Sequence, residues 1–116
     1  MPPDANRYAE FTRGLADAVL GPTRGAATEP SLRQAVEARA ASFGGRSGPR
    51  AEVPQALAQF VDRIAQHAWQ VTDDDVLALR RAGYSEQAIF EITASAAVGA
   101  GLARLERGLA ALRGTP

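Results

Sequence analysis

The stretch from Ser85 to Gly114 constrains the fold of this chain more than any other. It contains no proline and no cluster of turn residues, and its larger apolar residues recur at helical spacing at Ile92, Val98, Leu102, Leu105, Leu109 and Leu112. Ser85 is a good N-cap residue, and Gly114 can end a helix in the left-handed conformation. The pattern predicts one helix about 40 Å long at a rise of about 1.5 Å per residue. A domain of this size needs a shorter helix, so part of this helix must pack on a partner or project from the domain.

The composition favours helices packed into one domain. Alanine makes up about a fifth of the 116 residues, aromatic residues make up only 6%, and runs of β-branched residues that strands need are missing. We therefore expect one all-α domain over 1–116, with its core between about 28 and 113. A core of alanine and leucine lets helices approach closely but gives each helix little large apolar area to bury. A homo-oligomer is therefore attractive.

Four shorter helices are expected before the long one, which gives a bundle of about five. They are predicted at about 6–20, 28–43, 54–71 and 72–82, with glycine and proline between them. Thr28 and Thr72 are the expected N-caps of the second and fourth helices, and Pro54 is a good first residue for the third. The acidic run 73–75 suits the first turn of the fourth helix. In that helix Val76, Leu77 and Leu79 are predicted to face inward.

Charge and cysteine content exclude several classes of function. Thirteen basic residues, all arginine, balance thirteen acidic ones, so no electrostatic footprint for nucleic acid is present. Without cysteine there is no disulfide, thiolate metal site or thiol nucleophile, and a single histidine excludes a multi-histidine zinc site. No metal or cofactor is expected. The N-terminus does not read as a signal peptide and no apolar run approaches 18 residues, so we expect a soluble, cytoplasmic protein without a membrane partner.

His67 and Glu91 are the candidate catalytic residues. An imidazole titrates near neutral pH and needs only one orienting partner to act as a general base. The competing interpretation of His67 is structural, with the ring packed beside Trp69. Glu91 lies among apolar neighbours, where its carboxylate would be partly desolvated unless an arginine such as Arg39 pairs with it. A structural salt bridge and a catalytic carboxylate are both open for Glu91.

Small residues gather in the middle of the long predicted helix. Gly99, Ala100 and Gly101 look like half of a dinucleotide-binding fingerprint, but no strand precedes them. A close helix crossing explains them better, because small side chains expose the backbone to a neighbouring helix.

The C-terminal half of the chain resembles a known superfamily. The segments QFVDRI, LRRAGYSEQAI and the small-residue helix that follows them, together with PSLRQAVEARAASFGG earlier in the chain, are similar to the alkylhydroperoxidase-D-like, carboxymuconolactone decarboxylase superfamily. The similarity covers most of residues 30–112. It implies an alkylhydroperoxidase-D-like helical bundle whose protomers intertwine as dimers, trimers or hexamers.

The resemblance also implies which redox residues this chain lacks. Redox members place a glutamate on the leading helix, a Cys-x-x-Cys pair after the glycine turn and then a histidine. Aligning the glycine turns puts Gln34 at the glutamate, Arg46 and Pro49 at the cysteines and Val53 at the histidine. All four residue types are missing, so thiol peroxidase or disulfide reductase chemistry is physically excluded.

Two functions follow, and the first is preferred. The chain is either an oligomeric, non-redox binding or structural protein, or a cofactor-free enzyme similar to the decarboxylase branch that acts on a small organic acid. In the enzyme, His67 would be the acid or base and Glu91 would orient it, while Arg39 or Arg104 would hold the substrate carboxylate in a bidentate contact. A pocket shared by His67, Glu91 and an arginine would favour the enzyme.

Overall fold

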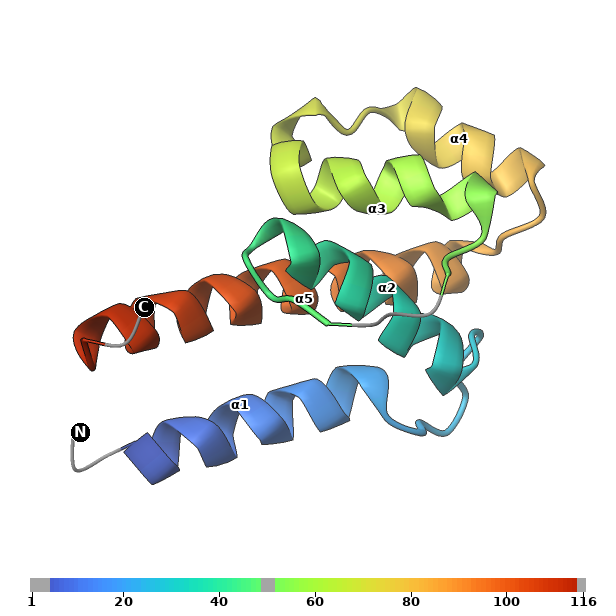
Figure 1. Cartoon of the computed structure of the whole chain (residues 1–116). Helices are drawn as coiled ribbons and strands as arrows, with labels where there is room; N and C mark the ends of the chain where they lie inside the picture. Colours follow the sequence, from blue (N-terminus) through green and yellow to red (C-terminus); the bar gives the residue numbers. More distant parts are fainter. Residues whose placement is uncertain (1–4, 49–51, 115–116) are drawn as a thin grey trace.

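The structure of the chain, a computed structural model, describes residues 5–48 and 52–114, and no β-strand occurs within these two ranges (Figure 1). Its elements are α1 (Ala5–Leu20), α2 (Pro30–Phe43), α3 (Gln55–His67), the short 3₁₀ turn η1 (Ala68–Gln70), α4 (Asp73–Arg81) and α5 (Glu86–Leu112). The predicted all-α class, with about five helices and a long C-terminal helix, is confirmed.

Helix α5 is the element on which the others assemble. α2 crosses it, α3 packs against both α2 and α5, α4 folds back over α3, and α1 runs antiparallel beside α5 (Figure 1). The core residues come from α2, α3, α4 and α5 and from the segment before α3: Ala35, Val36, Ala40, Val53, Leu57, Phe60, Val61, Ala65, Leu79, Ile89, Ile92, Ala96 and Ala100. α1 supplies none of them, so this helix is attached to the core rather than part of it.

The crossing of α2 and α5 depends on a missing side chain. A Cβ atom on Gly99 would lie 2.2 Å from the carbonyl oxygen of Glu37, far inside contact distance. A Cβ on Gly101, two residues after Gly99, would meet nothing within 4 Å. The predicted helix crossing is therefore confirmed at Gly99, where the two backbones touch, while Gly101 faces open space.

Two predicted N-caps form as expected. The Thr72 hydroxyl accepts a hydrogen bond from the Asp75 amide, and the Asp75 carboxylate accepts one from the Thr72 amide at 2.9 Å, which completes a capping box. The Ser85 hydroxyl accepts from the Ala88 amide at 3.1 Å and caps α5. Arg63 of α3 donates to the same Asp75 carboxylate at 2.8 Å. The acidic run thus caps α4 and also docks it on α3.

The start of α2 and the end of α3 differ from the predictions. α2 has Glu29 as its N-cap instead of Thr28, because the Thr28 hydroxyl donates to Glu91 and is not used for capping. α3 begins after Pro54, and its regular hydrogen bonding stops at His67 instead of continuing to Val71. The backbone of His67 leaves the helical region, with φ −144° and ψ 57°, and the chain continues as the 3₁₀ turn η1.

The prediction for α4 is wrong at Leu77. Leu79 is buried and Val76 packs against the core, but Leu77 is 45% exposed. Val76 and Leu79 are three residues apart and share one side of the helix, whereas Leu77 is rotated by about 100° from Val76. α4 has 9 residues and packs on α3 and α5 through the side of Val76 and Leu79, so Leu77 stays exposed.

α5 qualifies as a candidate membrane-spanning helix, although no apolar run in the sequence approaches 18 residues. By length and composition it passes that test, with a mean hydropathy of 1.3 over its best 18-residue window. Of that window 44% is buried inside the protein, and a core helix passes the same test. Alanine, glycine, serine and threonine separate its large apolar residues, so no continuous run of large apolar residues marks it in the sequence.

Candidate functional site

The carboxylate of Glu91, which lines a cavity, accepts four hydrogen bonds. It accepts bonds from the amides of Ala27 at 2.8 Å and Thr28 at 2.9 Å, from the Thr28 hydroxyl at 2.5 Å and from the Gln87 side chain at 2.9 Å. Ala27 and Thr28 belong to the connection between α1 and α2, whereas Glu91 belongs to α5. The carboxylate therefore fastens that connection to the long helix.

Arg33 of α2 completes this attachment from the other side. The side chain is only 2% exposed, and its guanidinium lies 3.7 Å from the Glu91 carboxylate. It donates to the carbonyl oxygens of Val19 at 3.1 Å and Gly21 at 2.6 Å, and to both the hydroxyl and the carbonyl of Thr28. Arg33, Thr28 and Glu91 form one structural unit, the Arg33–Glu91 clasp, which holds the end of α1 and the start of α2 on α5.

Sequence reasoning missed Arg33 as a residue of this site, and the structure shows it paired and buried. A signal for this was present, since Arg33 stands three residues before Val36 and seven before Ala40, which places it on the buried side of α2. Glu91 lies beside an arginine, but this arginine is Arg33 and not the suggested Arg39. Arg39 faces α3 and pairs with Asp62, so it is committed elsewhere.

The hydrogen bonds fix the charge of Glu91. Partial burial by itself would raise the pKa of this carboxyl, but the bonds from Thr28, Ala27 and Gln87 together outweigh it and lower the pKa from 4.5 to about 2. The side chain is therefore an anion at neutral pH. Its pKa is poorly matched to general acid or base catalysis near pH 7, which favours a group that titrates close to that pH.

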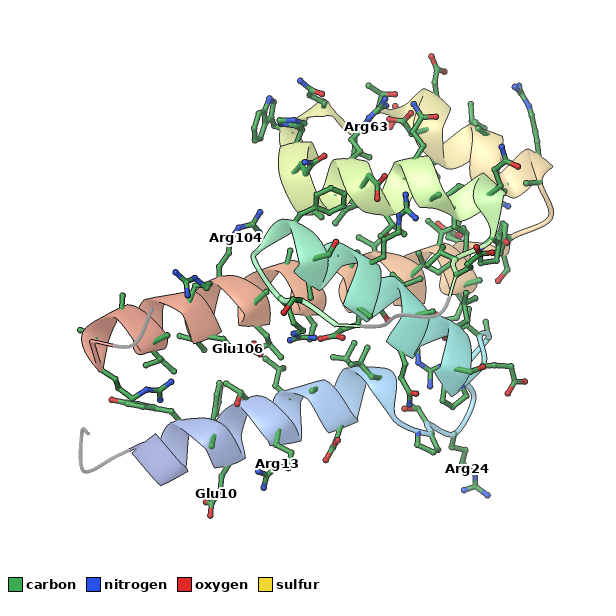
Figure 2. All side chains as sticks on the ribbon, viewed as in Figure 1. Glu10, Arg13, Arg24, Arg63, Arg104 and Glu106 are labelled. Carbon is green, nitrogen blue, oxygen red and sulfur yellow. The ribbon has the colours of Figure 1, made fainter. Side chains whose placement is uncertain are left out.

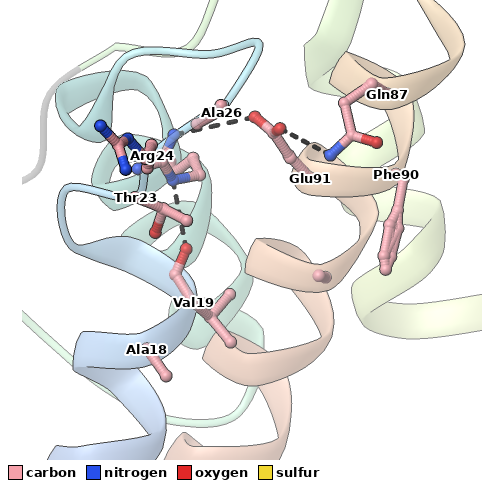
Figure 3. Close-up of a pocket in the computed structure, with 11 residues that line it drawn as sticks. Ala18, Val19, Thr23, Arg24, Ala26, Gln87, Phe90 and Glu91 are labelled. Carbon is pink, nitrogen blue, oxygen red and sulfur yellow. Dashed lines mark hydrogen bonds and ion pairs between the residues drawn. The ribbon is translucent and has the colours of Figure 1, made fainter.

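A cavity of about 200 Å³ lies beside the clasp, between the end of α1, the connection to α2 and the first turns of α5 (Figure 3). Its walls combine apolar and polar residues: Ala18, Val19, Phe90 and Ala94, then Thr23, Arg24, Arg33, Gln87 and Glu91. The head group of Arg24 points outward from the protein (Figure 2). Because Arg33 and Glu91 already bond to protein groups, the cavity offers mainly apolar surface.

His67 lies elsewhere. Its side chain is exposed at the end of α3 and meets the ring of Trp69 edge-on, with ring centroids 5.1 Å apart. His67 lines neither the cavity near Glu91 nor a smaller one of about 80 Å³ between α3 and α4. The predicted contact of His67 with Trp69 is confirmed. The structure does not bring His67 and Glu91 together in either cavity.

The two candidate substrate-binding arginines are also apart from the cavities. Arg39 donates to both oxygens of Asp62 at 2.6 and 2.8 Å, and this hydrogen bonding raises its pKa. Arg104 donates to the carbonyl of Ala65 at 2.7 Å (Figure 2 labels it). Neither arginine lines either cavity. The catalytic roles of His67 and Glu91 and the binding roles of these arginines stay predictions.

The positions aligned with the redox residues of the superfamily hold structural contacts. Arg46 bonds to Glu37 of α2 at 2.5 Å and to Glu106 of α5 at 2.9 Å. Val53 is in the core, and Gln34 is exposed on α2. The remaining position, Pro49, lies outside the described residues. Across 5–48 and 52–114, no three histidine or acidic side chains gather in a way that could hold a metal ion.

Comparison with protein-family models, with curated proteins and with solved structures finds no match to this chain. Its function therefore has to be inferred from the arrangement of its own residues.

Proposed function

We propose that this chain is an oligomeric, non-redox binding or structural protein of the cytoplasm, built on a bundle related to the alkylhydroperoxidase-D-like fold, and that it assembles with copies of itself. The proposal is supported by the all-α architecture, the absence of cysteine and the long helix α5, which each of the other four α-helices contacts. Self-assembly is its central claim.

One observation carries that claim: of the nine exposed large apolar side chains in the described residues, six lie on two neighbouring helices, α1 and α5. Tyr8, Phe11 and Leu15 of α1 and Phe90, Leu105 and Leu112 of α5 are all exposed. Isolated exposed apolar residues are ordinary on protein surfaces, but a set gathered on two neighbouring helices is typical of an interaction surface. A further copy of the chain would cover it.

The alternative, a cofactor-free enzyme acting on a small organic acid, gains no support from the site. His67 and Glu91 line no common cavity, and the hydrogen bonds on Glu91 keep it ionised at neutral pH. Arg39 and Arg104 are each bonded to other protein groups. No observation at the site favours this second function over the first.

The solution mass tests the proposed function. We expect light scattering or sedimentation equilibrium between about 1 and 500 µM to give a mass at least twice the 12.2 kDa of one chain at the upper end of the range. The protein needs no reductant, because it has no cysteine to form artefactual cross-links. A mass of one chain at every concentration would contradict self-assembly.

A further inference from the structure

The C-terminal half of α5 carries apolar residues at the alternating spacing of four and three that marks a coiled-coil seam. These residues form the α5 seam: Val98, Leu102, Leu105, Leu109 and Leu112. The buried residues of α5 end at Ala103, and every residue from Arg104 to Leu112 is at least partly exposed. Leu112 is 77% exposed. The α5 seam therefore continues past the core of a single copy.

Helix α1 carries a matching set. Its residues Tyr8, Phe11, Leu15 and Ala18 follow the spacing three, four, three and form the α1 seam. Glu10 and Arg13 point away from α5 in Figure 2, and the helical period places the α1 seam on the other side, toward α5. Phe11 is nevertheless 69% exposed. The α1 seam therefore points toward α5 (Figure 2), but α5 leaves its larger residues exposed.

An antiparallel helix pair leaves such seams half-covered for a geometric reason. Each helix shields one flank of its neighbour, and water still reaches the seam from the open side of the pair. Four helices around a common axis enclose all their seams at once, which is how helical bundles bury residues at this spacing. The α1 and α5 seams are thus arranged as half of a four-helix bundle.

We propose that a second copy of the chain supplies the other half, so that α1 and α5 of each copy pack on those of the other around a two-fold axis. The inference rests on the proposed self-assembly and names its surface. An isologous contact covers the same α1 and α5 seams on both copies, so one interface buries the exposed seams of both. The chain has zero net charge, so no overall repulsion opposes the pairing of two copies.

The area of the surface formed by the α1 and α5 seams sets the strength expected of the dimer. α1 has 16 residues. At about 1.5 Å per residue it is roughly 24 Å long, and two helices side by side are roughly 20 Å wide. The interface area is therefore on the order of 500 Å² per copy, without the extra area of an uneven side-chain surface. A standard interface buries about 800 Å² per partner. We expect a dimer that dissociates on dilution in the micromolar range.

A matched pair of substitutions tests the surface. Leu105→Glu alters a seam residue that is 43% exposed, and Leu77→Glu makes the same change on α4 at a residue that is 45% exposed. We expect Leu105→Glu to raise the dissociation constant of the dimer at least roughly 30-fold, the effect of losing a central interface contact. Leu77→Glu should leave it unchanged. Phe11→Glu, on the opposite helix, should match Leu105→Glu, and circular dichroism should show unchanged helix content in all three.

The outcomes separate this inference from the proposed function. A wild-type dimer dissociated by Leu105→Glu and Phe11→Glu but not by Leu77→Glu supports the bundle. A wild-type oligomer that survives both seam variants, a trimer, or an equal loss with Leu77→Glu overturns the bundle while self-assembly stands. A wild-type monomer at every concentration overturns both.

Discussion

Replacing Gly99 with alanine should lower the free energy of unfolding by about 3 kcal/mol, the upper end of the cost of overpacking a core. The added methyl group would lie 2.2 Å from the carbonyl oxygen of Glu37, and a backbone atom cannot move aside as a flexible side chain can. α2 and α5 would have to separate along the crossing that holds the core together. Urea unfolding followed by circular dichroism would measure the loss, and the melting temperature should fall by roughly 10 °C or more.

Gly101→Ala is the matched control for this prediction. It makes the same change in the same helix, where the new Cβ meets nothing within 4 Å. Glycine in a helix interior is less favourable than alanine by roughly 0.5–1 kcal/mol, so this variant should be as stable as the wild type or slightly more stable. A lower free energy of unfolding for Gly99→Ala and an equal or higher one for Gly101→Ala would identify the contact between the helices as the cause. A similar loss at both would contradict the crossing at Gly99.

Replacing Glu91 with glutamine should destabilise the protein by about 3 kcal/mol at pH 7. The lowered pKa of this carboxyl, about 2 against an ordinary 4.5, corresponds to roughly that free energy, at about 1.4 kcal/mol per pKa unit. Glutamine has one oxygen where the carboxylate has two, and its amino group would face donors of the α1–α2 connection. Arg33 would also remain buried without its anionic partner.

The same variant predicts a pH dependence with a definite direction. Because the folded-state pKa of Glu91 is lowered, its contribution is complete above the unfolded-state value near 4.5 and is lost as the pH falls toward 2. The stability difference between wild type and Glu91→Gln should therefore shrink across this window. Urea unfolding at pH 7, 4.5, 3.5 and 2.5 would measure it, since the other carboxyls titrate in both proteins and largely cancel.

Glu86→Gln serves as the control for the clasp. Glu86 stands in the first turn of the same helix, 90% exposed and only 4.0 Å from Arg80. An exposed pair of this kind contributes about 0–1 kcal/mol, so the loss should be small. An equal loss for Glu86→Gln and Glu91→Gln, or a Glu91→Gln loss that does not change with pH, would argue against the charged clasp as the source of stability.

Much of the fold could be predicted from the sequence because its signals are local. Ser85 and Thr72 cap their helices through groups only three residues away, and the glycine and proline breaks act on their own segments. The helical period, with the cap at Ser85 and the stop at Gly114, placed the long helix within two residues of its observed ends. Where a prediction failed locally, as at Thr28, a distant residue had taken the side chain.

The candidate site was less predictable because it depends on contacts between distant segments. Thr28 and Glu91 are 63 residues apart, and nothing in either segment specifies the other as its partner. Arg39 was the more visible arginine, yet its position on α2 turns it toward Asp62. His67 was marked by its chemistry, but the end of α3 leaves it exposed beside Trp69.

Residue types and their spacing along the chain are enough to predict the helical class, the ends of most helices and the exclusion of thiol chemistry. Which residues contact one another follows from the packed fold alone. It showed that Gly99 marks the crossing while Gly101 does not, and that Arg33 is the partner of Glu91. Packing assigns each side chain its neighbours, and those neighbours are set by how the helices cross rather than by any one segment.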